Sequence, residues 1–217
     1  MSKTKNHWSL GLVQSMNDPT AIYKETEKIV VIRDKYPKAK VHYLVLAREE
    51  ISSIFKLNKT LISLVTEMGS IFEKIKEDHK DTELVAGFHA VPSMQRLHMH
   101  VISTDMNSPS LKTKIHWNSF TTPFFIPYRG IKLFYILVVR FKIFNYPNII
   151  NVKVTRSVFY SMGKDIDYIL LQLEWNSDRI SSETHKSLLS TPLKCNQCEF
   201  MPKNMPQLKQ HLLSHIK

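Results

Sequence analysis

Residues 96–103, Arg96-Leu97-His98-Met99-His100-Val101-Ile102-Ser103, alternate between two kinds of side chain and predict a β-strand. Successive side chains of a strand point to opposite faces of a sheet. One face of this strand is apolar and would anchor it to a core: Leu97, Met99 and Val101. The opposite face carries the polar side chains and one isoleucine: Arg96, His98, His100 and Ile102. The strand therefore presents two imidazoles side by side on a rigid element.

Two adjacent imidazoles suit phosphate chemistry, because one can attack phosphorus while its neighbour hydrogen-bonds a non-bridging oxygen. Two other interpretations stay open: a pair of half-exposed histidines without a chemical role, and a metal site. No carboxylate and no third histidine stands at ligand spacing next to the pair, so the metal interpretation is the weaker of these. His98 and His100 are therefore candidates for phosphate chemistry.

The segments around this strand predict a small α+β domain with an antiparallel sheet. Strand-forming residues fill 28–33 and 40–47, and a proline-containing turn at 34–39 joins them. Apolar residues at helical spacing predict a helix over 59–76, and a further strand is expected over 83–89. The prediction rests on this order of two strands, a helix and two more strands.

The composition narrows the class of protein. With 217 residues, of which 43% are hydrophobic and 23% charged, the chain is long enough for one full domain and a smaller one. Five glycines leave no Gly-rich phosphate loop, and two cysteines exclude a disulfide scaffold. The most apolar run, 133–139, is too short to span a membrane, and the N-terminus has no signal peptide. We expect a soluble intracellular protein with no membrane partner, and the net charge of +11 favours a polyanion.

Residues 126–161 differ from the rest of the chain. They contain six Lys or Arg residues and no Asp or Glu, and removing those six lowers the net charge from +11 to +5. Ile, Phe, Lys, Asn and Tyr, whose codons are rich in A and T, make up 20 of the 36 residues. This composition indicates a translated intron or a lineage-specific insertion outside the fold. The alternative is that 133–139 forms a buried strand. Downstream we expect a short helix over 165–175 and a polar linker over 176–192.

The spacing Cys195-x2-Cys198-x12-His211-x3-His215 is that of a C2H2 zinc finger. Two thiolates on a tight turn and two imidazoles one helical turn apart can converge on a tetrahedral ion. A tail of this size cannot fold on its own core, so a structural zinc ion would supply much of its folding free energy. The sequence thus predicts a zinc finger over 193–217, with either a nucleic acid or a protein as its partner.

Residues 88–94, Phe-His-Ala-Val-Pro-Ser-Met, followed by the histidine strand, resemble the histidine-triad (HIT) superfamily. Further segments, together with the C-terminal finger, are similar to one branch of it: 7–9, 34–39, Ser108-Pro109, Leu111-Lys112 and 116–120. Members of that branch remove AMP from the 5′ end of DNA left adenylated by an aborted ligation, through a covalent nucleotidyl-histidine. The resemblance implies four parts: a HIT catalytic domain at 6–125, an insertion at 126–161, a helix and linker at 162–192 that complete the domain, and the finger at 193–217.

The resemblance also implies roles for single residues. His98 falls on the nucleophile, His100 on a phosphate contact, and His89 on a histidine that faces the phosphates. Arg96 falls where the family has its first triad histidine, and Ile115 falls where relatives often have a lysine that contacts DNA. Both depart from the pattern. The sequence has no acidic cluster of the kind that holds Mg²⁺, so we expect no catalytic metal and a structural zinc ion only.

A larger set of residues falls on positions that contact DNA or AMP in the family. Trp8 matches the aromatic residue that stacks on the exposed terminal base pair, and Asp34 matches the acid that receives the ribose hydroxyls. Lys112 or Lys114 could replace the lysine that is missing at position 115. The full set is Trp8, Ser15, Asp34, Lys35, Tyr36, Pro37, Lys38, Ser93, Met94, Arg96, Lys112 and Lys114.

The expected function is removal of AMP from 5′-adenylated ends of nicked double-stranded DNA during single-strand break repair, by a nuclear protein that binds as a monomer. Vertebrate members carry an N-terminal forkhead-associated domain, which we expect this protein to lack. Two alternatives remain. One is a HIT hydrolase of small adenylated nucleotides. The other is a non-catalytic zinc-finger protein that binds DNA ends, with a HIT domain inactivated by Arg96 and the segment 126–161.

Overall fold

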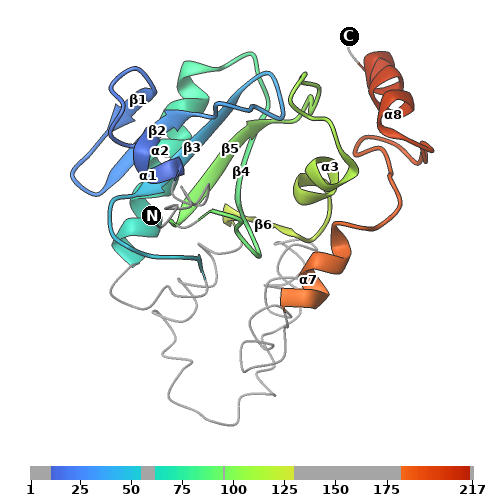
Figure 1. Cartoon of the computed structure of the whole chain (residues 1–217). Helices are drawn as coiled ribbons and strands as arrows, with labels where there is room; N and C mark the ends of the chain where they lie inside the picture. The colour runs from blue at the N-terminus through green and yellow to red at the C-terminus, as the bar shows by residue number, and fades with distance from the viewer. Residues whose placement is uncertain (1–10, 55–61, 95, 130–181, 216–217) are drawn as a thin grey trace, which may run out of the picture.

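The computed structural model describes residues 11–54, 62–94, 96–129 and 182–215. In this part of the chain six strands form one antiparallel sheet, in the order β1-β2-β3-β5-β4-β6 (Figure 1). The strands are β1 (Ile22–Glu25), β2 (Ile29–Arg33), β3 (His42–Ala47), β4 (Leu84–His89), β5 (His98–Ser103) and β6 (Phe125–Pro127). The predicted α+β class and antiparallel sheet are confirmed, and the four predicted strands are β2 to β5.

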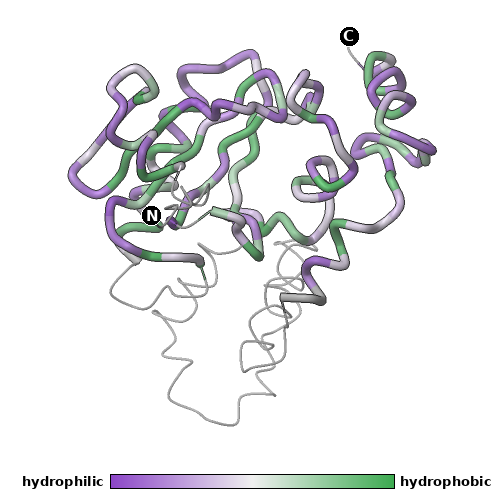
Figure 2. Tube along the Cα trace, in the orientation of Figure 1, coloured by the Kyte–Doolittle hydropathy of each residue, from purple (hydrophilic) through white to green (hydrophobic). Residues whose placement is uncertain are grey.

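Each face of the sheet has its own hydrophobic core. The helix α2 (Ile62–Asp78) packs on one face, where Met99 and Val101 are buried, so the apolar face predicted for the histidine strand is confirmed. The short helix α1 (Gly11–Ser15) lies on the opposite face, where Leu12 packs with Leu44. Figure 2 shows hydrophobic residues along the strands and hydrophilic residues along the outer loops. No helix in the described residues is long and apolar enough to cross a membrane.

Among the described residues up to Arg129, four elements were not predicted from the sequence: β1, β6, α1 and α3 (Lys114–Thr121). They are short, and the periodic signal of a helix or strand needs several repeats to be visible. The helix α3 begins with a cap instead, because the hydroxyl of Thr113 accepts a hydrogen bond from the N–H of His116 over 3.2 Å.

Residues 126–128 belong to the sheet and its core. Ile126 pairs with Phe88, and Ile126 and Tyr128 are buried in the core that α2 covers. Gly69 of α2 leaves room for Tyr128, since a Cβ atom at Gly69 would overlap the tyrosine ring. The insertion predicted over 126–161 therefore begins too early, because an apolar stretch without acids has the same composition as a buried strand. The rest of that segment from residue 130 onward, and the helix predicted over 165–175, lie outside the described residues.

The linker predicted over 176–192 is also corrected, because Ser182–Leu188 form a helix, α7. The chain just after this helix is held by Asn118 of α3, whose side-chain amide donates to the carbonyls of Leu189 (3.0 Å) and Thr191 (2.9 Å). Within the helix, His185 is buried. Tertiary contacts can hold a short polar helix that its own sequence does not favour.

The C-terminal finger packs directly on the sheet domain. It contains the helix α8 (Met205–Leu212) and a 3₁₀ helix, η5 (Leu213–His215). Trp117 of α3 is 0% exposed and lies in a core that also contains Ile102 of β5 and Leu208 of α8. The indole Nε1 of Trp117 donates to the carbonyl of Lys194 over 2.9 Å. The finger and the sheet domain thus share one hydrophobic core.

We expect Gly69→Ala to destabilise the protein by ~1–3 kcal/mol, because the added methyl group overlaps the buried ring of Tyr128. In a Tyr128→Ala background the same change should stabilise the protein by up to ~1 kcal/mol, because alanine favours the helix more than glycine does. Urea titration of the four proteins in this double-mutant cycle measures both free energies of unfolding. Equal effects in the two backgrounds would contradict the docking of residue 128 on α2.

Candidate functional site

Three neighbouring strands bring four histidines together. β3 and β4 flank β5 in the sheet, so His42 at the start of β3 and His89 at the end of β4 reach the pair His98 and His100. The ring centroids of His89, His98 and His42 lie 4.3, 5.0 and 5.2 Å from that of His100. His100 is therefore the centre of a cluster of imidazoles on one face of the sheet.

The backbone decides which nitrogen of His42 and of His100 carries the proton. The N–H of Lys38 donates to Nδ1 of His42 over 3.1 Å, so this nitrogen is the acceptor of a neutral ring. His42 then carries its proton on Nε2, which donates over 3.0 Å to Nδ1 of His100. His100 in turn carries its proton on Nε2. This N–H is buried and has no partner among the described residues, so it is available to an anionic oxygen.

His98 is held in the opposite tautomer. Its Nδ1 lies 2.7 Å from the carbonyl oxygen of Arg96, which can only accept, so Nδ1 carries the proton and Nε2 carries the lone pair. Burial lowers the pKa of His98, which keeps the ring neutral at neutral pH. A neutral imidazole with its lone pair on Nε2 is a nucleophile. A pocket beside this ring is lined by His89, Arg96 and His98, with Ser52 and Ser53.

Burial keeps the other histidines of the cluster neutral as well. It lowers the pKa of His42 to about 4 and holds the pKa values of His89 and His100 well below the ordinary value, and neighbouring rings add to the effect. The carboxylate of Asp34, 3.4 Å from Nδ1 of His42, opposes the shift at His42 without cancelling it. At neutral pH the site therefore offers the N–H of His100 as a donor and the lone pair of His98 as a nucleophile.

Phe120 of α3 closes one side of the cluster. Its ring meets those of His42 and His100 edge-on, with centroids 5.5 and 5.1 Å away, and it lies 4.8 Å from His89. An apolar ring at this position excludes water from the imidazoles, which contributes to their low pKa values.

The fold also supplies the third histidine that the sequence spacing did not show. Ligand atoms of Asp34, His42 and His100 lie within 4.8 Å of one another, so these residues could hold a metal ion. An ion at this place would have to replace the hydrogen bonds from Lys38 to His42 and from His42 to His100. The arrangement fits a hydrogen-bonded relay better than a metal site.

The predicted DNA- and AMP-binding residues lie on both sides of the histidine cluster. The turn between β2 and β3 holds five of them: Asp34, Lys35, Tyr36, Pro37 and Lys38. The carboxylate of Asp34 accepts the N–H of Tyr36 over 2.7 Å and shapes this turn, while the Tyr36 side chain is exposed. Met94 packs on the core beneath α1, which carries Ser15.

Other predicted contacts have different surroundings. Ser93 and Lys112 are exposed, whereas Lys114 donates from Nζ to the carbonyl of Ser190 over 3.0 Å and so ties α3 to the chain after α7. Ile115, one of the two departures from the family pattern, is exposed. Trp8 lies outside the described residues.

Basic side chains from three elements gather beside the turn and define a basic cluster: Lys38, Lys112, His116 and Lys209. Burial, Lys38 and Lys112 lower the pKa of His116, and burial and Lys112 lower the pKa of Lys209. Lys209 also donates from Nζ to the carbonyl of Ser108 over 2.7 Å, which holds α8 beside the sheet domain. Basic groups that repel one another in this way favour binding of a polyanion.

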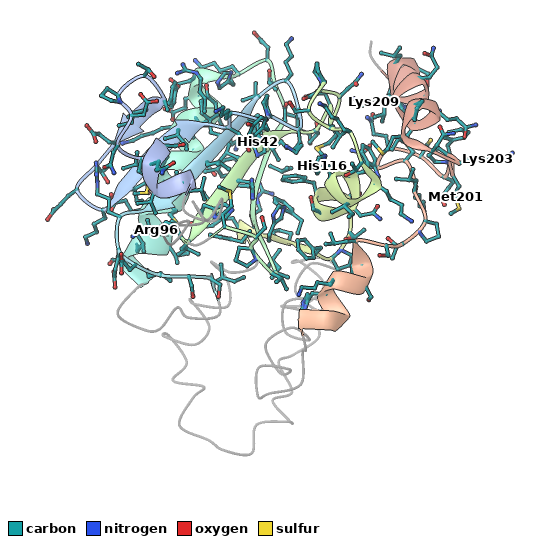
Figure 3. All side chains as sticks on the ribbon, in the orientation of Figure 1. His42, Arg96, His116, Met201, Lys203 and Lys209 are labelled. Carbon is teal, nitrogen blue, oxygen red and sulfur yellow. The ribbon has the colours of Figure 1, made fainter. Side chains whose placement is uncertain are left out.

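Figure 3 shows how the labelled members of the site are arranged. His42 lies on the sheet, His116 lies on the neighbouring helix α3, Lys209 lies on the finger, and Arg96 lies at the end of the sheet that is farther from the finger. The sequence did not single out His42, His116 or Lys209. The one usable signal is at His42, a polar residue within the strand-forming run 40–47.

The four predicted zinc ligands converge. Ligand atoms of Cys195, Cys198, His211 and His215 lie within 4.8 Å of one another. Sγ of Cys198 is 3.1 Å from Nε2 of His211, and Sγ of Cys195 is 3.5 Å from Nε2 of His215. Such separations are close to the ~3.5 Å edge of a tetrahedron with zinc at its centre. The donor set and its geometry fit a structural zinc ion.

Sequence comparisons give the following relatives. Residues 7–116 match the family described as "Scavenger mRNA decapping enzyme C-term binding", and residues 164–217 match the "C2HE / C2H2 / C2HC zinc-binding finger". Aprataxin of Ciona intestinalis is 38% identical over 213 residues, which cover 96% of this chain and 46% of that protein. Aprataxin of Gallus gallus is 37% identical over 212 residues, which cover 96% of this chain and 55% of that protein. This chain thus spans about half the length of these two proteins.

An aprataxin-like protein of Saccharomyces cerevisiae is 32% identical over 152 residues, which cover 55% of this chain and 70% of that protein. Among solved structures, the aprataxin ortholog Hnt3 from Schizosaccharomyces pombe has a TM-score of 0.58 at 22% identity, covering 98% of this chain and 93% of that one. The structure titled "Hnt3 in complex with DNA and guanosine" has a TM-score of 0.61 at 21% identity, covering 96% and 95%. The HIT-like fold with its finger is shared with these proteins.

We expect the free energy of unfolding to fall as the pH drops below about 6.5, because the unfolded chain then binds protons that the buried histidines do not. His42→Gln should reduce this slope by up to ~1.4 kcal/mol per pH unit between about pH 6 and pH 5, because it removes one such group. Glutamine can still accept from Lys38 and donate to His100. Urea titrations of both proteins at several pH values measure the slopes, and the two proteins differ only at residue 42. Identical slopes would contradict a neutral, buried His42.

Cys198→Ser should release zinc and lower the melting temperature of the whole protein by ~4–8 °C, because the finger shares the core around Trp117 with the sheet. Gln197→Ala changes the adjacent exposed residue and is the matched control. Metal analysis and thermal unfolding followed by circular dichroism measure the two effects. An unchanged transition of the sheet domain after zinc loss would show that the finger folds independently.

Proposed function

This chain belongs to the aprataxin family of histidine-triad proteins, and we propose that it removes AMP from the 5′ end of adenylated DNA through a covalent AMP–His98 intermediate. The observation that carries the proposal is a pair of opposite tautomers on one strand. His98 presents a lone pair at Nε2, and His100 presents an N–H at Nε2. Attack on a phosphorus atom requires both a nucleophile and a donor to the oxygen on which charge develops.

In the first step, Nε2 of His98 attacks the phosphorus of the AMP group. A P–N bond forms while the P–O bond to the 5′-phosphate of the DNA breaks, and the bonding electron pair leaves with that phosphate. A phosphate is a good leaving group, so this step needs no strong general acid. The N–H of His100 donates to a non-bridging oxygen, and the carbonyl of Arg96 accepts from Nδ1 of His98 as that ring becomes cationic.

In the second step, water attacks the phosphorus of the His98–AMP adduct. A P–O bond forms, the P–N bond breaks, and its electron pair returns to Nε2 of His98, while the proton of the water passes to solvent. The low pKa of the His98 ring makes it a good leaving group in this step. Two displacements of this kind replace one difficult hydrolysis, which is the usual benefit of covalent catalysis.

The basic cluster supports DNA as the carrier of the AMP group. Lys38 comes from the turn after β2, Lys112 precedes α3, and Lys209 comes from the finger, so the sheet domain and the finger would bind one polyanion together. The ortholog Hnt3 has been solved in complex with DNA, which supports this assignment. Nicked DNA with an adenylated 5′ end is the proposed substrate, bound by a monomer in the nucleus. Affinity should fall with salt, as expected when lysines displace counterions from phosphates.

The arginine at position 96 does not by itself favour a non-catalytic DNA-end binder. The contact that fixes the tautomer of His98 comes from the backbone carbonyl of Arg96, which any residue at this position would supply. The relay that fixes His100 runs through His42 and Lys38 and does not involve Arg96. Both parts of the proposed machinery are therefore present.

We expect His98→Asn to lower AMP release from 5′-adenylated nicked DNA by ~10⁴-fold or more, because asparagine cannot form the P–N bond. DNA affinity should stay within a few-fold, because binding is spread over two modules. His79→Asn changes a histidine that contacts Tyr43 outside the site and is the matched control. Release of labelled AMP and electrophoretic mobility shifts measure the two quantities. Retained turnover in His98→Asn, or an acid-labile AMP adduct on another residue, would overturn the assignment.

A further inference from the structure

Arg96 has an unusual backbone conformation next to the nucleophile. Its φ angle is 142°, in a region that residues with a Cβ atom rarely adopt. A residue keeps such a conformation only where the surrounding structure holds it, and such residues concentrate at functional sites. The same residue points its carbonyl at Nδ1 of His98. The strained backbone thus belongs to the geometry of the site.

The guanidinium of Arg96 makes one short hydrogen bond and one longer ion pair within the protein. Nη1 donates to the carbonyl of Arg48 over 2.7 Å, whereas Nη2 lies 3.6 Å from the carboxylate of Glu50. The Arg96 side chain is only 11% exposed, but that of Glu50 is 92% exposed. An exposed ion pair at this distance contributes little free energy, so an incoming anion can replace Glu50 at small cost.

Arg96 lies on the side of the nucleophile away from Asp34. Arg96 precedes β5, and His98 and His100 follow it along that strand. At the other end of this row, His100 contacts His42, which in turn lies beside Asp34. The pocket beside His98 has Arg96 in its wall, together with His89. An AMP group whose ribose lies toward Asp34 and whose phosphorus lies at His98 therefore has its leaving group on the side of Arg96.

We propose that the Arg96 guanidinium binds the phosphate that leaves in the first step and thereby selects phosphoanhydrides of AMP over AMP joined to a neutral leaving group. A guanidinium is planar and can bind two phosphate oxygens at once. When the P–O bond breaks, the electron pair adds negative charge to this phosphate, and Arg96 stabilises that charge without giving up a proton. In a phosphoramidate of AMP the P–N bond to the amine breaks instead, and the departing nitrogen takes a proton from solvent, so a neutral amine leaves and no negative charge develops on it. This inference rests on the proposed AMP transfer to His98.

The test compares three substrates: 5′-adenylated nicked DNA, diadenosine diphosphate and adenosine 5′-phosphoramidate. The first two expel a phosphate and the third expels an amine, and the two small substrates do not depend on DNA binding. Arg96→Gly removes the guanidinium, keeps the carbonyl that holds His98, and tolerates the positive φ angle. Arg96→Lys keeps the charge without the planar fork. Arg33→Lys changes an exposed arginine that lies over Tyr23 and is the matched control.

For Arg96→Gly we expect kcat/KM to fall by ~10²-fold or more on both phosphoanhydrides and by less than ~3-fold on the phosphoramidate, with an intermediate loss for Arg96→Lys. Glu50→Gln should raise kcat/KM on the phosphoanhydrides by up to ~5-fold, because it removes the competing carboxylate. Equal losses on all three substrates in Arg96→Gly would show a structural role and overturn the inference. Wild-type activity on the small substrates without activity on adenylated DNA would overturn only the DNA assignment. Inactivity of the wild type on all three would overturn both.

Discussion

The hydrogen bond from the backbone N–H of Lys38 to Nδ1 of His42 determines which nitrogen of His100 can donate in the site. From this one contact follow the tautomer of His42, the direction of its bond to His100, and the presence of an N–H on the outer nitrogen of His100. Burial makes this order stable, because it keeps both rings neutral and removes water as an alternative partner. The turn at 34–39, proposed to face DNA, is thereby connected through a single ring to the donor proposed to bind the phosphate.

The helix α3 joins the zinc centre to the histidine cluster. Trp117 points into the core shared with the finger, and its indole holds the carbonyl of Lys194, directly before the first zinc ligand. Phe120, three residues later, covers His42, His89 and His100. One helix of eight residues therefore contacts both centres. A structural zinc ion would act on the site through this packing, without taking part in the chemistry.

The sequence predicted those parts of the protein that depend on short-range spacing. The alternation around His98 and His100 gave their strand and its buried face, and the spacing of Cys195 and its partners gave the finger. His42 and Lys209 could not be found in this way, because strand order and the packing of α8 bring them to the site. The prediction that residues 126–128 lie outside the fold was wrong for a related reason. A buried strand and an inserted apolar segment have the same composition, and only the pairing of β6 with β4 distinguishes them.

The histidine triad is defined by residues on a single strand, whereas the histidine cluster of this protein is built from three strands: β3, β4 and β5. His98 takes its tautomer from a backbone carbonyl, and His100 takes its tautomer from His42 on the neighbouring strand. Neither depends on the side chain at position 96. That side chain is therefore free to differ in chemical type without disturbing the nucleophile or its neighbouring donor. An arginine at this position adds a positive charge to the wall of the pocket, and it leaves intact the relay from Lys38 through His42 to His100 on which the proposed attack at phosphorus depends.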